Sequence, residues 1–266
     1  MNLGVDKIYA INLKRFKERK RNIKKISKKL DVEINIISGY DNKDYIPLKD
    51  PSLIKHLPTS FWDPNGWITL GIICCALSHR KAYKEFLDSD AETALFLEDD
   101  VRITDYIYQY NFNDVKNELN TLDWGVCWYG KYFDKIITGD KLTDNISKAS
   151  PHQEGQYAGH AYVLNRKSAE WFYKNTETIK YAADVRLEIS PFNQVTLNNS
   201  VFVQLQTDYY LKKEKIHDEM FHNTLEDAWW DKENKINRSQ ELPIKSFNKK
   251  SFGLGSQTLS GWEFFF

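Results

Sequence analysis

A short apolar segment that ends in three consecutive carboxylates constrains this chain more than any other stretch. Residues 94–97 are all apolar, and Glu98, Asp99 and Asp100 follow them directly. Such a run is typical of a strand buried on both faces, as in the mostly parallel sheet of an α/β protein. Ligands of these sheets bind beyond the carboxyl ends of the strands, so we expect the three acids at a binding edge.

The alternation of side chains along a strand divides the three acids. Glu98 and Asp100 should point to one side of the strand end and Asp99 to the other. Because neighbouring carboxylates repel one another, a positive charge is expected among them. Carboxylate oxygens suit a hard divalent cation that carries a phosphate-bearing substrate. The alternative is an acidic turn that caps a helix or faces solvent, but the apolar strand in front of it favours a binding site.

The N-terminal region predicts a strand, a helix and a second strand, the beginning of a nucleotide-binding α/β half. The strands are expected at residues 7–13 and 33–41, and the helix between them begins near Arg15 and Arg19. A helix start that carries arginines offers charge and backbone N–H groups to a phosphate. Alternatively, the basic side chains of this helix form a face that is exposed to solvent and binds no phosphate. The apolar stripe of the helix comprises Ile23, Ile26 and Leu30.

The next expected helix covers residues 69–87, after an irregular segment at 42–66. The apolar positions of this helix that recur at the spacing of one helix face are Ile72, Cys75, Ala76 and His79. His79 is either a buried core residue or part of a ligand pocket, and Ser78 can bond back to the preceding turn. The chain has neither GxGxxG nor a Walker loop, which disfavours nicotinamide cofactors and ATP hydrolysis.

Further along the chain, strands are expected at 123–130, at 156–164 and within 200–211, with a loop at 131–154. Asn165 should cap a helix. Asp184 is an isolated acid in a mildly apolar setting, and it reads equally as a helix cap or a site residue. These elements suggest one domain over residues 1–200, with residues 201–266 as an extension packed on it.

The overall charge and the cysteine pattern exclude several classes of protein. The 266 residues contain 37 basic and 37 acidic side chains, which argues against a nucleic-acid partner. Three cysteines without a CxxC spacing predict a reducing compartment and no zinc motif. Without a signal-peptide core or a membrane-length apolar run, we expect a cytoplasmic protein with at most peripheral membrane contact.

Four motifs in this order resemble those of glycosyltransferase family 25. This family includes bacterial lipooligosaccharide galactosyltransferases and collagen hydroxylysine galactosyltransferases. The motifs lie between residue 7 and about residue 190. They are Ile11–Arg15 with Arg19, Gly71–His79, Leu97–Val101, and Gly159–Leu164 with the following Ser168, Ala169 and isolated Asp184.

The resemblance implies a GT-A type, Rossmann-like fold that binds a nucleotide sugar. It implies transfer of a hexose, with galactose favoured and glucose as an alternative, from a UDP-sugar to a hydroxyl of a glycan or hydroxylysine-type acceptor. The reaction would invert the sugar carbon and use a divalent metal, commonly Mn²⁺. The resemblance also implies a role in lipopolysaccharide biosynthesis.

The resemblance also assigns roles to individual residues. Glu98 and Asp100 would bind the metal, and Asp184 would be the catalytic base. His217 or His222 is conceivable as a further metal ligand. The expected donor-binding residues are Asn12, Arg15, Arg19, Ser78, His79, Glu98 and Asp99.

Two other functions compete with transfer. A catalytically silent glycan- or protein-binding module could keep the same fold, but such a protein could lose the acidic triplet freely. A metal-dependent phosphohydrolase would need further His or Asp ligands at short spacing, which the sequence does not offer.

Overall fold

The computed structural model describes residues 1–44, 70–131, 139–149 and 159–204. In this part of the chain a seven-stranded sheet has the order β2-β1-β3-β7-β5-β8-β6. Its strands are β1 (Lys7–Asn12), β2 (Asn35–Ser38), β3 (Thr93–Glu98), β5 (Val126–Trp128), β6 (Ile146–Lys148), β7 (Ala161–Asn165) and β8 (Gln194–Leu197).

Most strands of this sheet run in one direction. The pairs β2–β1, β1–β3 and β5–β8 are parallel, and β7 and β6 are antiparallel to their neighbours. The predicted α/β class with a mostly parallel central sheet is therefore confirmed. Because β1, β2 and β3 are parallel, their carboxyl ends meet at one edge, where the acidic triplet lies.

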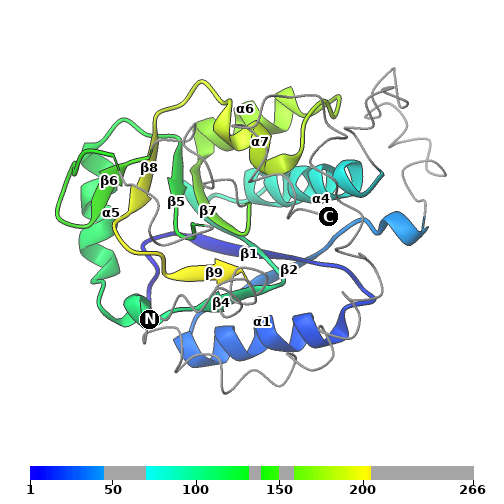
Figure 1. The fold of residues 1–266 in the computed structure, drawn as a ribbon, viewed down its shortest axis with the longest axis horizontal. Coiled ribbons are helices and arrows are strands. Elements are labelled where there is room, and N and C mark those ends of the chain that lie inside the picture. The colour runs from blue at the N-terminus through cyan, green and yellow to red at the C-terminus, as the bar shows by residue number, and fades with distance from the viewer. Residues whose placement is uncertain (45–69, 132–138, 150–158, 205–266) are drawn as a thin grey trace, which may run out of the picture.

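Helices cover both faces of the sheet (Figure 1), with α4, α6 and α7 over one face and α1 over the other. The helices are α1 (Lys17–Leu30), α4 (Leu70–Leu87), α5 (Phe112–Thr121), α6 (Arg166–Asn175) and α7 (Ala183–Glu188), with 3-10 turns η1 (Asn42–Asp44) and η2 (Asp105–Tyr108). The sheet thus forms the middle of three layers.

Alternation along the central strands builds two hydrophobic cores. Leu95 and Leu97 of β3 face the core beneath α1 and α5, whereas Ala94 and Phe96 face the core beneath α4 and α6. All four side chains are fully buried. The strand is held rigidly between two packed layers, so the acids that follow it have fixed positions.

A small second sheet lies beside the acidic triplet. It pairs β4 (Val101–Ile103) with β9 (Phe202–Gln204) in antiparallel register, with Val101 opposite Gln204. β9 begins just after the boundary expected at residue 200, and it returns the chain to the end of β3. Residues 205–266, including His217 and His222, lie outside the described residues.

Three strands were not expected from the sequence. β4 follows the acidic triplet directly, where no separate strand was expected. β6 lies within the segment 131–154 that was interpreted as a loop, and β8 lies in a segment for which no strand was expected. The expected cap of α6 is confirmed, since the Asn165 side chain accepts a hydrogen bond from the Ser168 N–H at 2.8 Å. Among the described helices, none is long and apolar enough to cross a membrane.

Candidate active site

Asp99 anchors the end of β3 to the end of β1. Its carboxylate accepts hydrogen bonds from Asn12 Nδ2 at 2.8 Å and from Arg19 Nη1 at 2.9 Å. The Leu13 backbone N–H approaches the same carboxylate at 3.4 Å. The expected separation of the triplet is observed, because Asp99 turns to β1 and α1 while Glu98 and Asp100 share another partner, Gln204.

Arg19 is the cation at this edge of the sheet. Its guanidinium pairs with Asp99 and lies 3.5 Å from Asp100. Burial opposes its charge, but the carboxylates of Asp99 and Asp100 outweigh burial and hold the pKa of Arg19 above its usual range. The arginine therefore offsets part of the repulsion within the triplet.

Gln204 of β9 joins the two remaining acids. Its Nε2 lies 3.3 Å from Glu98 Oε2 and 3.4 Å from both carboxylate oxygens of Asp100. Its Oε1 is buried and accepts no hydrogen bond from any described residue. Sequence reasoning missed Gln204, because only the antiparallel pairing of β4 with β9 brings this residue to the triplet.

The donor set around Gln204 fits a hard divalent cation. Two carboxylates converge on one amide, and the same amide carries a buried oxygen without a partner in the described chain. Carboxylate and amide oxygens are the ligands that such cations prefer. Glu98 and Asp100 are thus suited to the metal role expected of them, and rotation of the Gln204 amide would turn Oε1 towards them in place of Nε2.

His79 of α4 reaches the other side of Glu98. Its Nε2 lies 3.4 Å from Glu98 Oε1, and its Nδ1 lies 2.7 Å from the Tyr162 hydroxyl. Tyr162 in turn shares a hydrogen bond of 2.7 Å with the Tyr83 hydroxyl. This buried chain of hydroxyls fixes the orientation of the imidazole and keeps one ring nitrogen facing the site.

Asp184 lies next to Glu98 and His79 across a glycine. A Cβ on Gly159 would lie 3.6 Å from Glu98 Oε1, 3.7 Å from Asp184 Cβ and 3.8 Å from His79 Cε1. These are ordinary contact distances, so a side chain here would occupy space shared by all three residues. The glycine keeps that space open at the amino-terminal end of β7.

The surroundings of Asp184 favour the protonated, neutral form of its carboxyl group. Burial raises its pKa to about 6, and the charge of Glu98 adds to that effect. The Val185 N–H, which donates to Asp184 Oδ1 at 2.9 Å, acts in the opposite direction. A carboxylate with a pKa near 6 is well matched to proton transfer near neutral pH.

Two of the expected donor-binding residues have other partners in the structure. Ser78 is buried, donates to the Cys74 carbonyl at 2.6 Å and accepts from the Tyr40 N–H at 2.8 Å. Arg15 pairs with Asp41 at 2.7 Å. Ser78 thus fixes the chain after β2, and the donor-binding roles of both residues stay predictions.

Comparison with known proteins agrees with this arrangement. The family described as glycosyltransferase family 25 (LPS biosynthesis protein) matches residues 5–187. The matched region contains β1, α4, the acidic triplet, Gly159 and Asp184. The chain therefore belongs to glycosyltransferase family 25, as the four motifs indicated.

The similar curated proteins are much longer than this chain. Human procollagen galactosyltransferase 2 is 26% identical over 172 residues, which cover 63% of this chain and 27% of the human protein. A glycosyltransferase 25 family member of Drosophila melanogaster is 26% identical over 132 residues, covering 48% and 21% of the two chains. This chain thus matches about a quarter of their length.

A solved structure is also similar. It is described as a glycosyltransferase involved in the glycosylation of the major capsid of PBCV-1. The alignment covers 78% of this chain and 98% of the other, with 10% identity and a TM-score of 0.37.

Proposed function

We propose that this protein is a metal-dependent hexosyltransferase that moves a sugar from a UDP-sugar to an acceptor hydroxyl with inversion. The observation that carries the proposal is the convergence of Glu98 and Asp100 on Gln204, with Asp184 beside Glu98 across Gly159. Such a transfer requires two carboxylates that can bind a cation and a further carboxyl group that can take a proton. A pKa of about 6 suits Asp184 to the second role.

The donor would lie over the carboxyl ends of β1 and β3. Glu98 and Asp100 would hold a divalent cation, Mn²⁺ being our first candidate, and Gln204 Oε1 would complete the oxygen set after the amide has rotated to exchange Nε2 for Oε1. The bound cation supplies positive charge to the diphosphate that departs from the sugar. Arg19 is a fixed positive charge nearby, while Asp99 and Asn12 keep it in position.

Asp184 would act as the general base. In the proposed step the acceptor oxygen forms a bond to the sugar carbon and its proton passes to the Asp184 carboxylate. The bond from that carbon to the phosphate oxygen breaks, and UDP leaves with the electron pair. Attack from the face opposite the diphosphate inverts the carbon.

The sugar and the acceptor are proposed from the relatives. Procollagen galactosyltransferases are named for galactose and procollagen, so we favour galactose as the sugar and a hydroxylysine-type or glycan hydroxyl as the acceptor. Glucose is the alternative sugar.

The test is turnover with a panel of UDP-sugars. Purified protein is incubated with each donor and Mn²⁺, then with a chelator, and UDP release is measured. We expect slow hydrolysis of one donor that is lost with chelator and in Asp100→Ala. Asp90→Ala, which removes an exposed acid outside the site, is the matched control and should keep the activity.

One pair of results would reject the proposed transferase function. If no donor turns over and calorimetry detects no metal-dependent binding of UDP, the silent binding module becomes the better account. Turnover that is equal with and without chelator would instead reject the role of the metal.

A further inference from the structure

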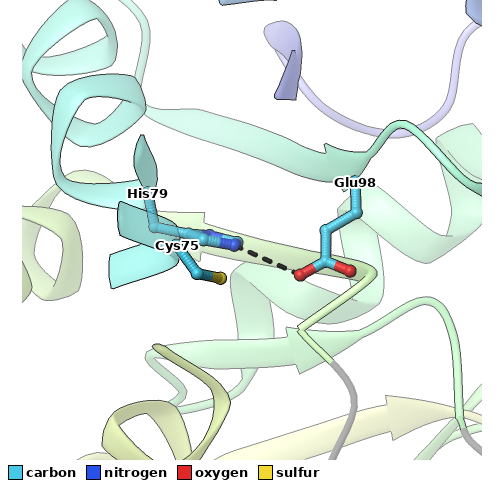
Figure 2. A group of neighbouring side chains, drawn as sticks. All are labelled: Cys75, His79 and Glu98. Carbon is cyan, nitrogen blue, oxygen red and sulfur yellow. Dashed lines mark hydrogen bonds and ion pairs between the residues drawn. The ribbon is translucent and has the colours of Figure 1, made fainter. Parts of the chain in front are cut away.

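A cysteine, a histidine and a glutamate form a second group of potential metal ligands beside the acidic triplet. In the described chain, the ligand atoms of Cys75, His79 and Glu98 all lie within 4.8 Å of one another. Figure 2 shows Cys75 and His79 on neighbouring turns of α4, both directed towards the Glu98 carboxylate at the end of β3. Residues four apart on a helix share one face, which lets both side chains reach one ion.

The sequence placed Cys75 among the apolar positions of α4, but the structure gives it a different setting. Ile72, Ala76 and His79 are buried, and the described chain leaves Cys75 partly open, but burial and the charges of Glu98 and Asp184 raise the pKa of its thiol well above the ordinary value. Cys74 and Cys127 are buried. Among the described residues, Cys75 is the cysteine whose Sγ lies beside His79 and Glu98, and a bound cation would offset the cost of forming its thiolate.

The distance between His79 and Glu98 suits a bridging ion. Their nearest atoms are 3.4 Å apart, which is long for a hydrogen bond. Two ligands at about 2.05 Å from a tetrahedral zinc ion are themselves about 3.3–3.4 Å apart. The observed separation thus matches one edge of a zinc coordination tetrahedron without movement of either side chain.

The environment of His79 also suits a ligand. Its Nδ1 is hydrogen-bonded to the Tyr162 hydroxyl. When Nδ1 carries the proton and donates this hydrogen bond, the lone pair of Nε2 points towards Glu98. A metal-bound histidine usually has such a partner on its other nitrogen. Gly159 has no side chain that could compete for the position beside Glu98 and His79.

We propose that Cys75 Sγ, His79 Nε2 and a Glu98 carboxylate oxygen form a binding site for a thiophilic divalent cation of the Zn²⁺ class. A thiolate, an imidazole and a carboxylate are ligands that zinc takes in tetrahedral sites with an open fourth position. The site differs from the oxygen-lined pair of Glu98 and Asp100, which suits harder cations.

Glu98 belongs to both groups. Its Oε1 faces His79 and its Oε2 faces Gln204. Zinc held by Cys75 would engage the carboxylate that the donor site needs, so zinc should inhibit sugar transfer. This consequence rests on the proposed function, whereas the binding site itself does not.

Cobalt absorption tests the site without any assay of transfer. Co²⁺ replaces zinc and gives a thiolate charge-transfer band when a cysteine is its ligand. We expect this band in the full chain, with its loss in Cys75→Ser and its retention in Cys74→Ala and Asp100→Asn. Tyr162→Phe, which removes the partner of His79 Nδ1, should weaken zinc binding by about 10- to 100-fold in competition with a chromophoric chelator.

A measurement on the unaltered protein removes any dependence on the folding of variants. Zinc added to the cobalt-loaded protein should displace Co²⁺ and remove the thiolate band. Absence of the cobalt band, an equal band in Cys75→Ser, or a band that excess zinc leaves unchanged would each overturn the site.

The inhibitory consequence has its own test. With Mn²⁺ present, the zinc concentration that halves UDP-sugar turnover should rise at least about tenfold in Cys75→Ser, each protein being compared with its own zinc-free rate. Equal zinc sensitivity of the two proteins would reject the consequence. Failure of the UDP-sugar panel would reject the proposed function and leave the cobalt result standing.

Discussion

At the scale of single residues, Asp184 carries the clearest conflict between stability and function. Its carboxyl group is buried, and its pKa of about 6 lies above the ordinary value of 3.8. Charging it in the folded protein is therefore costlier than in the unfolded chain. Proteins retain such destabilising groups where activity needs them, which fits a catalytic base.

Asp184→Asn should lose transfer and gain stability. The amide cannot take a proton, so we expect turnover to fall by about 10²- to 10⁴-fold. It can still accept the Val185 N–H, and it removes the cost of a buried charge, so the free energy of unfolding at pH 7.5 should rise by about 1–3 kcal/mol. Urea denaturation measures the gain, and Asp90→Asn serves as the exposed control. A variant that is inactive and also less stable would contradict this account.

The same group predicts two pH dependences. Turnover should fall as the pH drops through about 6, because the base becomes protonated. The folded state binds this proton more tightly than the unfolded state, so the Asp184 contribution to stability improves as the pH falls from about 6 towards 3.8. The stability difference between wild type and Asp184→Asn should therefore shrink over that window. A difference that stays constant from pH 7.5 to pH 4.5 would show that Asp184 titrates elsewhere.

Arg19 and Arg21 provide a comparison within one helix. The Arg19 side chain is 15% exposed and faces two buried carboxylates, whereas the Arg21 side chain is 66% exposed and pairs with Glu18. Arg19→Met removes the buried cation that pairs with Asp99 and lies beside Asp100, and it should cost about 3–5 kcal/mol of unfolding free energy. Arg21→Met should cost about 0–1 kcal/mol. Equal losses in urea denaturation would mean that the buried ion pair has no special role.

At the scale of elements, the pairing of β4 with β9 completes the candidate site. β9 comes about 100 residues after the triplet in sequence, yet its register sets Gln204 opposite Val101. The separation of Glu98 and Asp100 from Asp99 was expected from strand alternation, but β3 ends at Glu98 and the turn that follows it sets the directions of Asp99 and Asp100. The amide that joins Glu98 and Asp100 depends on this long-range pairing.

Gln204→Met tests the contribution of β9. The substitution keeps the length of the side chain but removes the amide, whose Nε2 lies near Glu98 and Asp100. We expect Mn²⁺-dependent binding of UDP to weaken by about tenfold, a free-energy loss of about 1.4 kcal/mol. Calorimetry measures it, and Gln109→Met on the exposed end of η2 is the matched control. Unchanged affinity in Gln204→Met would exclude the amide from the donor site.

At the scale of the whole molecule, local patterns predicted the elements near the site. The apolar run before Glu98 and the helical spacing around His79 are short-range signals, and both elements have the expected type. β6 was missed because its three residues lie in a polar segment, and the antiparallel direction of β7 depends on tertiary pairing. The pairing of strands that lie far apart in the sequence cannot be derived from the strand propensity of single residues.

The candidate site was predictable to a similar degree. Motif order predicted the acids and Asp184 as candidates, but their distances to Gln204 and Gly159 are properties of the fold. Cys75 shows the limit most clearly, since helical spacing alone suggested a core position and the structure places it beside Glu98 and His79.

Calorimetric titration of UDP into the protein, with and without Mn²⁺, is the most direct test of the central claim. The claim is that Glu98 and Asp100 hold a cation that binds the nucleotide diphosphate. We predict that UDP binds with Mn²⁺, that chelator weakens this binding at least about tenfold, and that Asp100→Ala removes the difference. Equal UDP affinity with and without the metal, or an unchanged metal effect in Asp100→Ala, would contradict the claim.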